Sequence, residues 1–368
     1  MDPVKPDYGG AWIGAVVPAL LARASSPPPW LPEPAATADG TVLLVLDGLG
    51  WSMLETFRGQ LPELAGMAGG PITACAPTTT AAGLTSIVTG LTPAEHGMVG
   101  YRMRHEGQIL NVLRWTVPGG RSGAPDPADV QHQPAFQGAA VPVVTRAEFR
   151  DTGFTHAHLR GAQLVGWHTT SSLVEHVRRL VARGRELVYA YYDGIDKIAH
   201  AYGLTNGFLE QELRSADRLV GRLLDVLPGS HALLVVADHG QVHVGPGDLV
   251  EVDEVAALVQ EQSGESRFRY LHARRGAAAE LAAGCREQYG DRAWVFTREE
   301  LLEEGWLGPE PSPEVGQRVG DVILAAQGPI GFLDPSHQQE ARLVARHGSL
   351  TTDEMLVPLL AARGRAPA

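Results

Sequence analysis

The chain has 368 residues, of which 44% are hydrophobic and 20% charged, a balance typical of a folded globular protein rather than a disordered one. Its 42 acidic and 30 basic side chains give a formal net charge of −12, which argues against a nucleic-acid backbone as the main partner. Two cysteines, Cys75 and Cys285, are too few for a disulfide-stapled scaffold.

The first segment, residues 1–34, is expected to be an extended lead-in to the fold, because its end is rich in proline. Its apolar run from Trp12 to Ala22 contains Pro18 and does not resemble a secretory signal. No stretch of about 18 apolar residues follows, as a membrane-spanning helix would require. We therefore expect a cytoplasmic protein that does not use a membrane as a partner.

Three apolar runs predict buried parallel strands, because both of their alternating faces are apolar. They are TVLLVLDGLG, ELVYAYYDGID and HALLVVADHG, and each leads into at least one aspartate. Between the last two runs, leucine, alanine and valine recur at helical spacing from Leu209 to Leu227. This alternation predicts an α/β fold with a doubly wound, mostly parallel central sheet flanked by helices, whose ligands gather at the carboxyl ends of the strands.

The chain is predicted to form one core with an inserted excursion. The core comprises residues 35–246 and 320–368, and the run DVILAAQG returns the chain to this core, which MLVPLLAA closes. Residues 247–319 form the inserted α/β excursion, and residues 101–166, rich in glycine and proline, are expected to decorate the edge of the sheet.

Acidic and imidazole side chains cluster at the predicted strand ends. The D-x-x-x-H spacing puts one carboxylate and one imidazole on the same face of a helix, and the adjacent Asp-His-Gly follows a strand directly. The candidate ligands are Asp47, Asp196, His200, Asp238, His239 and His347. Mixed oxygen and nitrogen ligation suits zinc or a similar metal better than calcium, and six ligands fit two ions that share a substrate.

A nucleophile is expected near these ligands. Thr78, Thr79 and Thr80 precede the helical pattern of AAGLTSIVTG, so a threonine hydroxyl would lie beside free backbone N–H groups at a helix start. The alternative is simple N-capping, the commonest role of threonine at that position.

Four motifs together resemble those of the alkaline-phosphatase superfamily, and most closely its nucleotide pyrophosphatase/phosphodiesterase family. They are PTTTAAGLTSIVTGLTPAEHG, YYDGIDKIAHAYG, VVADHG and RHGSLTTDEM. Their order along the chain is the order found in that family, and they extend over most of the sequence. The resemblance therefore implies a metallo-hydrolase core.

The resemblance also implies a division of the ligands between two zinc ions, with manganese as the other candidate metal. One ion would be held by Asp196, His200 and His347, and the other by Asp47, Asp238 and His239, with Thr80 bridging as nucleophile. The implied reaction is attack of Thr80 on a small phosphodiester or pyrophosphate, through a phosphothreonine intermediate. The alternatives are a phosphomonoesterase or phosphonate hydrolase on the same fold, and a metal-binding relative that has lost catalysis.

The sequence departs from the family pattern at two positions. Gly83 replaces the usual asparagine that holds a phosphate oxygen, and Ala81 replaces the usual aromatic residue after the nucleophile. Compensating charge is expected from backbone N–H groups or from one of Arg102, Arg104 and Arg114.

Four further residues have weaker functional interpretations. Asp193 is the second choice as a ligand after Asp196, and His243 is either an exposed loop residue or a support for a ligand. His96 is expected to be structural. Cys75 lacks the C-x-P-x-R pattern of sulfatases, which disfavours a sulfatase-type nucleophile.

Overall fold

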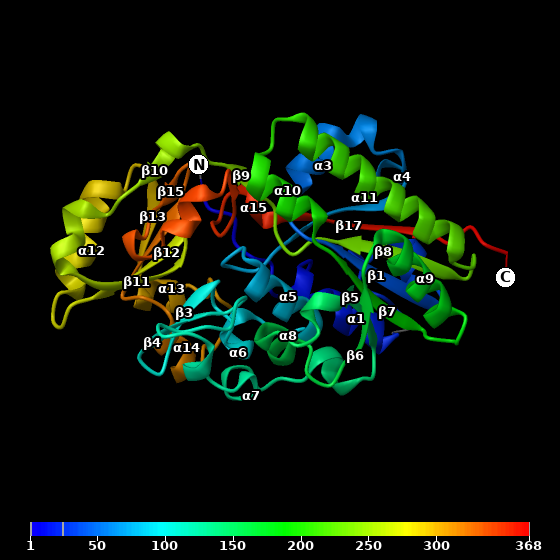
Figure 1. The fold of residues 1–368 in the computed structure, drawn as a ribbon, viewed down its shortest axis with the longest axis horizontal. Helices are drawn as coiled ribbons and strands as arrows, with labels where there is room; N and C mark the ends of the chain where they lie inside the picture. The colour runs from blue at the N-terminus through cyan, green and yellow to red at the C-terminus, as the bar shows by residue number, and fades with distance from the viewer. Residues whose placement is uncertain (1, 24–25, 368) are drawn as a thin grey trace.

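The computed structural model describes residues 2–23 and 26–367, and a seven-stranded sheet runs through its larger half (Figure 1). The strand order is β2-β17-β8-β1-β7-β5-β6. In the centre, β1 (Gly40–Leu46) pairs in parallel with β7 (Leu187–Tyr192) and β8 (His231–Val236). Every residue of β1 is buried, which explains its uninterrupted apolar sequence. The predicted doubly wound, mostly parallel sheet is confirmed.

The edges of this sheet come from segments on either side of the three central strands. β5 (Pro142–Arg146) and β6 (Gln163–Trp167) extend it in parallel, so the region expected to decorate the edge supplies two of its strands. At the other side, β17 (Leu356–Arg363) runs antiparallel to β8 and to β2 (Ala68–Thr73).

Helices cover both faces of the sheet (Figure 1). On one face, α11 (Gly207–Val226) contacts α9 (Thr170–Val181) and α4 (Pro62–Ala65). On the other face, α5 (Thr80–Thr89) packs against α1 (Val16–Ala22). The remaining helices are α2 (Glu33–Ala36), α3 (Trp51–Phe57), α6 (Pro93–His96), α7 (Pro127–Val130), α8 (Gly153–His158), α10 (Gly194–Tyr202), α12 (Ala278–Tyr289), α13 (Arg298–Glu303), α14 (Pro313–Arg318) and α15 (Thr352–Met355).

The lead-in is not wholly extended, contrary to the prediction. Ile13, Val16 and Val17 are fully buried in a 3-10 turn and in α1, where they join the main core. The prolines that follow led to the prediction of an extended segment, because proline indicates where a helix ends and gives no information on the helix before it. Within the described residues, no helix has the length and apolar character needed to cross a bilayer. The cytoplasmic location stays a prediction.

A second, antiparallel sheet lies beside the first, with the order β11-β12-β14-β13 (Figure 1). Its strands are β11 (Val259–Glu265), β12 (Phe268–Ala273), β13 (Ala293–Thr297) and β14 (Val322–Ala326). The remaining short strands are β3 (Arg102–His105), β4 (Gln108–Asn111), β9 (Val242–His243), β10 (Leu249–Val250), β15 (Gly331–Phe332) and β16 (Ala345–Arg346).

The predicted return of DVILAAQG to the core holds only in part, because its strand, β14, pairs with β12 and β13 rather than with the strands of the central sheet. Both faces of β14 are buried: Val322 and Leu324 pack toward α12, while Ile323 and Ala325 join the main core. A strand covered on both sides has the same apolar sequence in either sheet, so composition did not distinguish them.

Candidate active site

Three of the predicted ligands lie where the central parallel strands end. Asp47 directly follows β1, and Asp238 lies two residues after β8. Asp196 lies in the first turn of α10, which begins two residues after β7, and His200 lies one turn further along the same helix. The spacing-based prediction of a helix here is confirmed. His347 arrives from the distant segment that follows β16.

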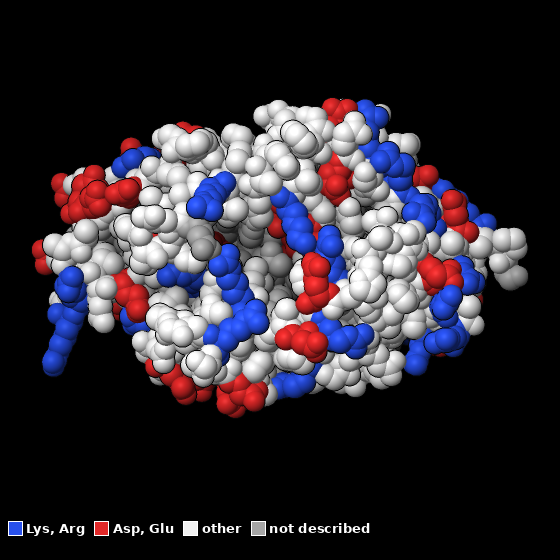
Figure 2. Space-filling model, in the orientation of Figure 1, with Lys and Arg blue, Asp and Glu red and all other residues white. Residues whose placement is uncertain are grey.

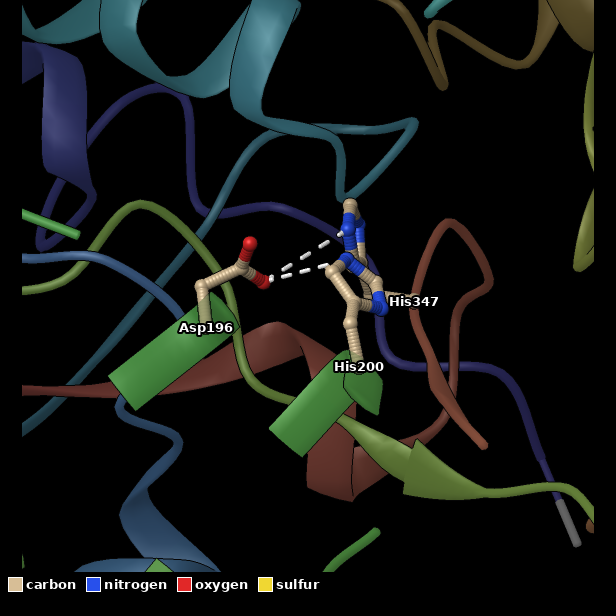
Figure 3. A group of neighbouring side chains, drawn as sticks. All are labelled: Asp196, His200 and His347. Carbon is tan, nitrogen blue, oxygen red and sulfur yellow. Dashed lines mark ion pairs between the residues drawn. The ribbon is translucent and has the colours of Figure 1, made fainter. Parts of the chain in front are cut away.

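Asp196, His200 and His347 form one compact group (Figure 3). The Nε2 atom of His200 lies 3.3 Å from Oδ1 of Asp196, and Nε2 of His347 lies 4.0 Å from the same oxygen. One ligand atom from each residue lies within 4.8 Å of the others. Two imidazoles and a carboxylate at these separations form a donor set suited to zinc.

A second group surrounds His239. Its Nε2 atom lies 3.5 Å from Oδ1 of Asp47 and 3.5 Å from Oδ2 of Asp238. Asp47 and His239 also lie within 4.8 Å of an oxygen of Asp196, and the rings of His239 and His347 stack with centroids 3.6 Å apart. The structure therefore brings all six predicted ligands into one continuous cluster, in which Asp196 links the two groups.

The three histidines of the cluster are oriented by backbone carbonyl groups. In each, Nδ1–H donates to a carbonyl oxygen, which leaves the Nε2 lone pair facing the cluster. The bonds join His200 to Ala345 (2.7 Å), His347 to Thr78 (2.7 Å) and His239 to Gly240 (3.1 Å). This arrangement is the one that metal-ligating histidines adopt.

The carboxylates of the cluster lack compensating positive charge. Burial raises the pKa of Asp47 well above its usual value, and repulsion from Asp238 and Asp196 raises it further. Burial also raises the pKa of Asp238. Among the described residues, Oδ1 of Asp47 and Oδ2 of Asp238 are buried without a hydrogen-bond partner. Bound divalent cations would satisfy these oxygens, so the residues present fit a metal centre.

Thr80 is the threonine of the three that reaches this cluster. It is the first residue of α5, and its Oγ1 lies 3.1 Å from Nε2 of His239. The residue at the N-cap is Thr79, whose side chain makes no capping hydrogen bond. Thr78 instead donates its hydroxyl hydrogen to the carbonyl oxygen of Ser349, at 2.8 Å. The N-capping alternative therefore does not describe Thr80.

Two residues that the sequence analysis missed support the ligands. Tyr191, in β7, donates a hydrogen bond from its hydroxyl to Oδ2 of Asp47. Gln241 donates from Nε2 to Oδ1 of Asp196, at 3.0 Å. Neither residue belongs to a spacing pattern, because each meets its partner only through the tertiary fold.

Both residues that depart from the family pattern, Gly83 and Ala81, are tightly packed in the structure. A Cβ atom at Gly83 would lie 2.9 Å from Cβ of Asp238 and 3.0 Å from its carbonyl oxygen. The glycine thus allows α5 to approach the ligand-bearing loop closely, and no larger side chain fits there. Ala81 is fully buried in the same helix.

The remaining candidates lie outside the cluster. Asp193 forms ion pairs with Arg146 and Lys197, both at 2.6 Å, so its charge is already balanced. His96 is buried, with Nε2 2.9 Å from Oγ of Ser86, in agreement with a structural role. His243 is exposed.

The three arginines that were predicted to supply compensating charge, and Cys75, have different surroundings from one another. Arg102 pairs with Asp334 at 2.5 Å, and Arg104 pairs with Glu261 at 2.7 Å. The third, Arg114, is exposed and lines a cavity beside Thr80. Cys75 is buried, and burial raises the pKa of its thiol to about 12, so it is not a reactive nucleophile.

Two cavities meet at Thr80, and Figure 2 shows a hollow at the middle of the face it presents, with basic side chains near its rim. One, of about 240 Å³, has a polar lining of Tyr101, Arg114, Asp196, His200, Glu265, Ser266, His337, Glu340, Arg346 and His347, beside Thr79, Leu113 and Leu343. The other, of about 230 Å³, combines the apolar and aromatic side chains of Leu84, Leu113, Phe149, Phe154, Leu159, Tyr189 and Tyr191 with the polar ones of Asp47, Thr145, Thr152, Thr155, His158, Asp193, Asp196 and Lys197. We call the first of these the polar cavity.

Known structures share this fold over most of its length. Mouse ectonucleotide pyrophosphatase/phosphodiesterase 5 superposes with a TM-score of 0.69 at 15% identity, over 89% of this chain and 88% of that one. Phosphonoacetate hydrolase from Sinorhizobium meliloti, in complex with phosphonoformate, gives a TM-score of 0.65 at 19% identity, over 89% and 91%. The chain thus shares its fold with both of these proteins over most of its length.

The sequence itself identifies the family. Residues 41–350 match the model of type I phosphodiesterase/nucleotide pyrophosphatase, so the chain belongs to that family of phosphoric ester hydrolases. A curated relative, GPI ethanolamine phosphate transferase 3 of Schizosaccharomyces pombe, is 29% identical over 86 residues. That match covers 23% of this chain and 9% of the length of the relative.

Proposed function

We propose that this protein is a two-metal phosphodiesterase of the nucleotide pyrophosphatase type, with Thr80 as its nucleophile. The observation that carries the proposal is the position of the Thr80 hydroxyl, 3.1 Å from Nε2 of His239 and at the first turn of α5. A hydroxyl at that place lies beside the candidate metal ligands and beside unpaired backbone N–H groups.

The six ligands are divided as the family resemblance implies. Asp196, His200 and His347 would hold one divalent cation, and Asp47, Asp238 and His239 the other, with zinc preferred over manganese. When bound, the cations supply Lewis acidity and charge neutralisation next to the phosphate.

The chain's own residues then carry the covalent chemistry. The Thr80 hydroxyl loses its proton to solvent as its oxygen forms a bond to phosphorus, the bond to the leaving oxygen breaks, and the leaving group departs with that electron pair. Water then attacks the phosphothreonine: its oxygen bonds to phosphorus, the bond to the Thr80 oxygen breaks, one water proton restores the Thr80 hydroxyl, and the phosphate product departs. The first N–H groups of α5 favour the negative charge of the phosphoryl oxygens, with help from the helix dipole.

The two cavities favour a small diester or pyrophosphate over a monoester, because each can hold one substituent of the phosphate. A mouse ectonucleotide pyrophosphatase/phosphodiesterase 5 variant, described as inactive and in complex with AMP, shares the fold with a TM-score of 0.66 at 15% identity. The similarity to phosphonoacetate hydrolase makes phosphonate hydrolysis the second candidate, since the polar cavity holds arginine side chains.

The test compares methyl 4-nitrophenyl phosphate with 4-nitrophenyl phosphate, which share one leaving group. We expect the metal-loaded protein to prefer the diester, and Thr80→Ala to lower kcat by about 10³-fold or more with metal content unchanged. Dominant cleavage of the monoester would indicate a phosphomonoesterase. Unchanged activity of Thr80→Ala would exclude Thr80 as nucleophile, and inactivity of the loaded wild type on both esters and on phosphonoacetate would indicate a lapsed enzyme.

A further inference from the structure

Four arginines are buried around the polar cavity and its supporting strands, and three of them have a carboxylate partner. These pairs are Arg102 with Asp334 (2.5 Å), Arg267 with Glu354 (2.7 Å) and Arg269 with Glu340 (2.6 Å). We call this set, together with the fourth residue, Arg346, the arginine cluster. Buried guanidinium groups normally require such partners, because removing a charge from water is costly.

Arg346 differs from the other three. It is 2% exposed, and its Nη2 donates to the carbonyl oxygen of Leu343 at 2.8 Å. Its Nε and Nη1 have no hydrogen-bond partner among the described residues, and no carboxylate of that part of the chain lies within 4.0 Å of it. The side chain lines the polar cavity, next to His347 in sequence. It is thus a buried cation whose free donors border a cavity.

Other unpaired groups line the same cavity. Oγ of Ser266 and both carboxyl oxygens of Glu265 are buried without a partner within the described ranges. Burial raises the pKa of Glu265 to about 8, so at neutral pH this carboxyl is mostly protonated and carries little negative charge. Glu340, another lining residue, pairs through Oε2 with Arg269 at 2.6 Å, while its Oε1 has no hydrogen-bond partner within the described ranges. The lining groups near Arg346 therefore offer hydrogen-bond donors to an anion, and the ion pair with Arg269 offsets the negative charge of Glu340.

The polar cavity lies on the side of the site that the leaving group would occupy. In an in-line displacement, the attacking and leaving oxygens lie on opposite sides of phosphorus. The attacking oxygen of Thr80 contacts His239, so the leaving oxygen faces Asp196, His200 and His347, which form a wall of the polar cavity. This step rests on the proposed function.

We propose that Arg346, assisted by the Ser266 hydroxyl, binds an oxyanion carried by the leaving group of the substrate. A carboxylate and a phosphate have the same chemistry for this purpose, since each offers anionic oxygens to guanidinium N–H donors. The preferred substrates are therefore phosphate esters or anhydrides whose leaving group is itself anionic.

The test measures kcat/KM on three methyl phosphates that differ in leaving group. Methyl 4-nitrophenyl phosphate releases a group without a further anion, methyl 3-carboxy-4-nitrophenyl phosphate releases one with a carboxylate, and methyl diphosphate releases phosphate. For Arg346→Met, we expect kcat/KM to fall about 10- to 100-fold on at least one anionic substrate and less than about 3-fold on the first. Arg346→Lys should restore part of the loss, and Arg104→Met, which removes a charge paired elsewhere, should show no such selectivity.

An equal fall on all three substrates would assign Arg346 a structural role and overturn the proposal. The two anionic substrates distinguish a carboxylate from a phosphate as the recognised group. If Arg346→Met does not fold, as judged by thermal unfolding and metal content, Arg346→Lys and Ser266→Ala provide the same comparison.

Binding provides a readout that does not depend on turnover. In a Thr80→Ala background, calorimetry should show that 5-hydroxy-2-nitrobenzoate binds more tightly than 4-nitrophenol, and that Arg346→Met removes the difference. Equal binding of the two phenols would contradict the proposal even in an active enzyme. Absence of all turnover together with selective binding would instead contradict the proposed function alone.

Discussion

Two buried charged clusters contribute to the polar cavity beside Thr80, and their charge imbalances have opposite signs. The candidate metal-ligand cluster contains Asp47, Asp196 and Asp238, and Oδ1 of Asp47 and Oδ2 of Asp238 lack hydrogen-bond partners among the described residues. The arginine cluster has a carboxylate for every guanidinium except that of Arg346. The carboxylate-rich cluster therefore lacks positive charge, and the arginine cluster lacks one negative charge.

In these two clusters, an unpaired buried charge indicates a ligand, whereas a charge paired with an opposite one indicates a structural role. Asp193, paired with Arg146 and Lys197, and Arg267, paired with Glu354, belong to the second kind. Because burial without a partner costs several kcal/mol, the two imbalances are expected to be relieved by what binds there. Both clusters can be tested by changing one charge at a time.

The largest effect is expected from Asp238→Asn, which removes a charge from the metal-ligand cluster while preserving shape. We expect loss of one of two bound metal equivalents and a fall in kcat of about 10³-fold, because a ligand to the second cation is neutralised. Metal analysis and kinetics on a diester measure this. Asp193→Asn is the matched control, and a similar loss of metal from that variant would contradict the distinction between paired and unpaired carboxylates.

The next effect concerns the paired part of the arginine cluster. Glu354→Gln leaves the guanidinium of Arg267 buried without its counter-charge, and both side chains are 0% exposed. We expect the free energy of unfolding to fall by about 3–5 kcal/mol, measured by urea denaturation. Glu186→Gln removes the partner of the exposed Arg23 and should cost less than about 1 kcal/mol. Similar losses from the two variants would show that burial does not decide the value of the pair.

A smaller effect is expected from Glu265, whose pKa burial raises from 4.5 to about 8. The native state then binds the proton more tightly than the unfolded state, so this group stabilises the fold fully below about pH 4.5. Its contribution declines as the pH rises toward about 8. The pKa difference sets an upper limit of about 5 kcal/mol, and we expect about half of it, since a buried carboxylate gains compensating contacts as it ionises.

The measurement compares the wild type with Glu265→Gln, which cannot ionise, by urea denaturation at several pH values and constant metal content. The free energy of unfolding of the wild type should fall relative to that of the variant between pH 5 and 8. Parallel pH profiles for the two proteins would show that Glu265 has a partner in solution. The polar cavity would then hold a negative charge near Arg346.

Sequence alone determined the central strands and most of the candidate metal-ligand cluster. A strand buried on both faces must be continuously apolar, and the loop after it must turn at the carboxyl end of the sheet, so the positions of Asp47 and Asp238 followed from local pattern. The i to i+4 spacing likewise placed Asp196 and His200 on one face of α10. These features depend on residues that are close together in the sequence, so they can be predicted from it.

Only the tertiary structure decided the position of β14, the support of Asp47 by Tyr191, and the isolation of Arg346 among paired arginines. Each of these three features depends on which segments, far apart in the sequence, come into contact in the folded protein. An apolar strand fits either sheet, and an arginine has the same local sequence signature whether a carboxylate lies beside it or not. Charge balance in a buried site is a property of the assembled surroundings, so the leaving-group preference inferred here became visible only in three dimensions.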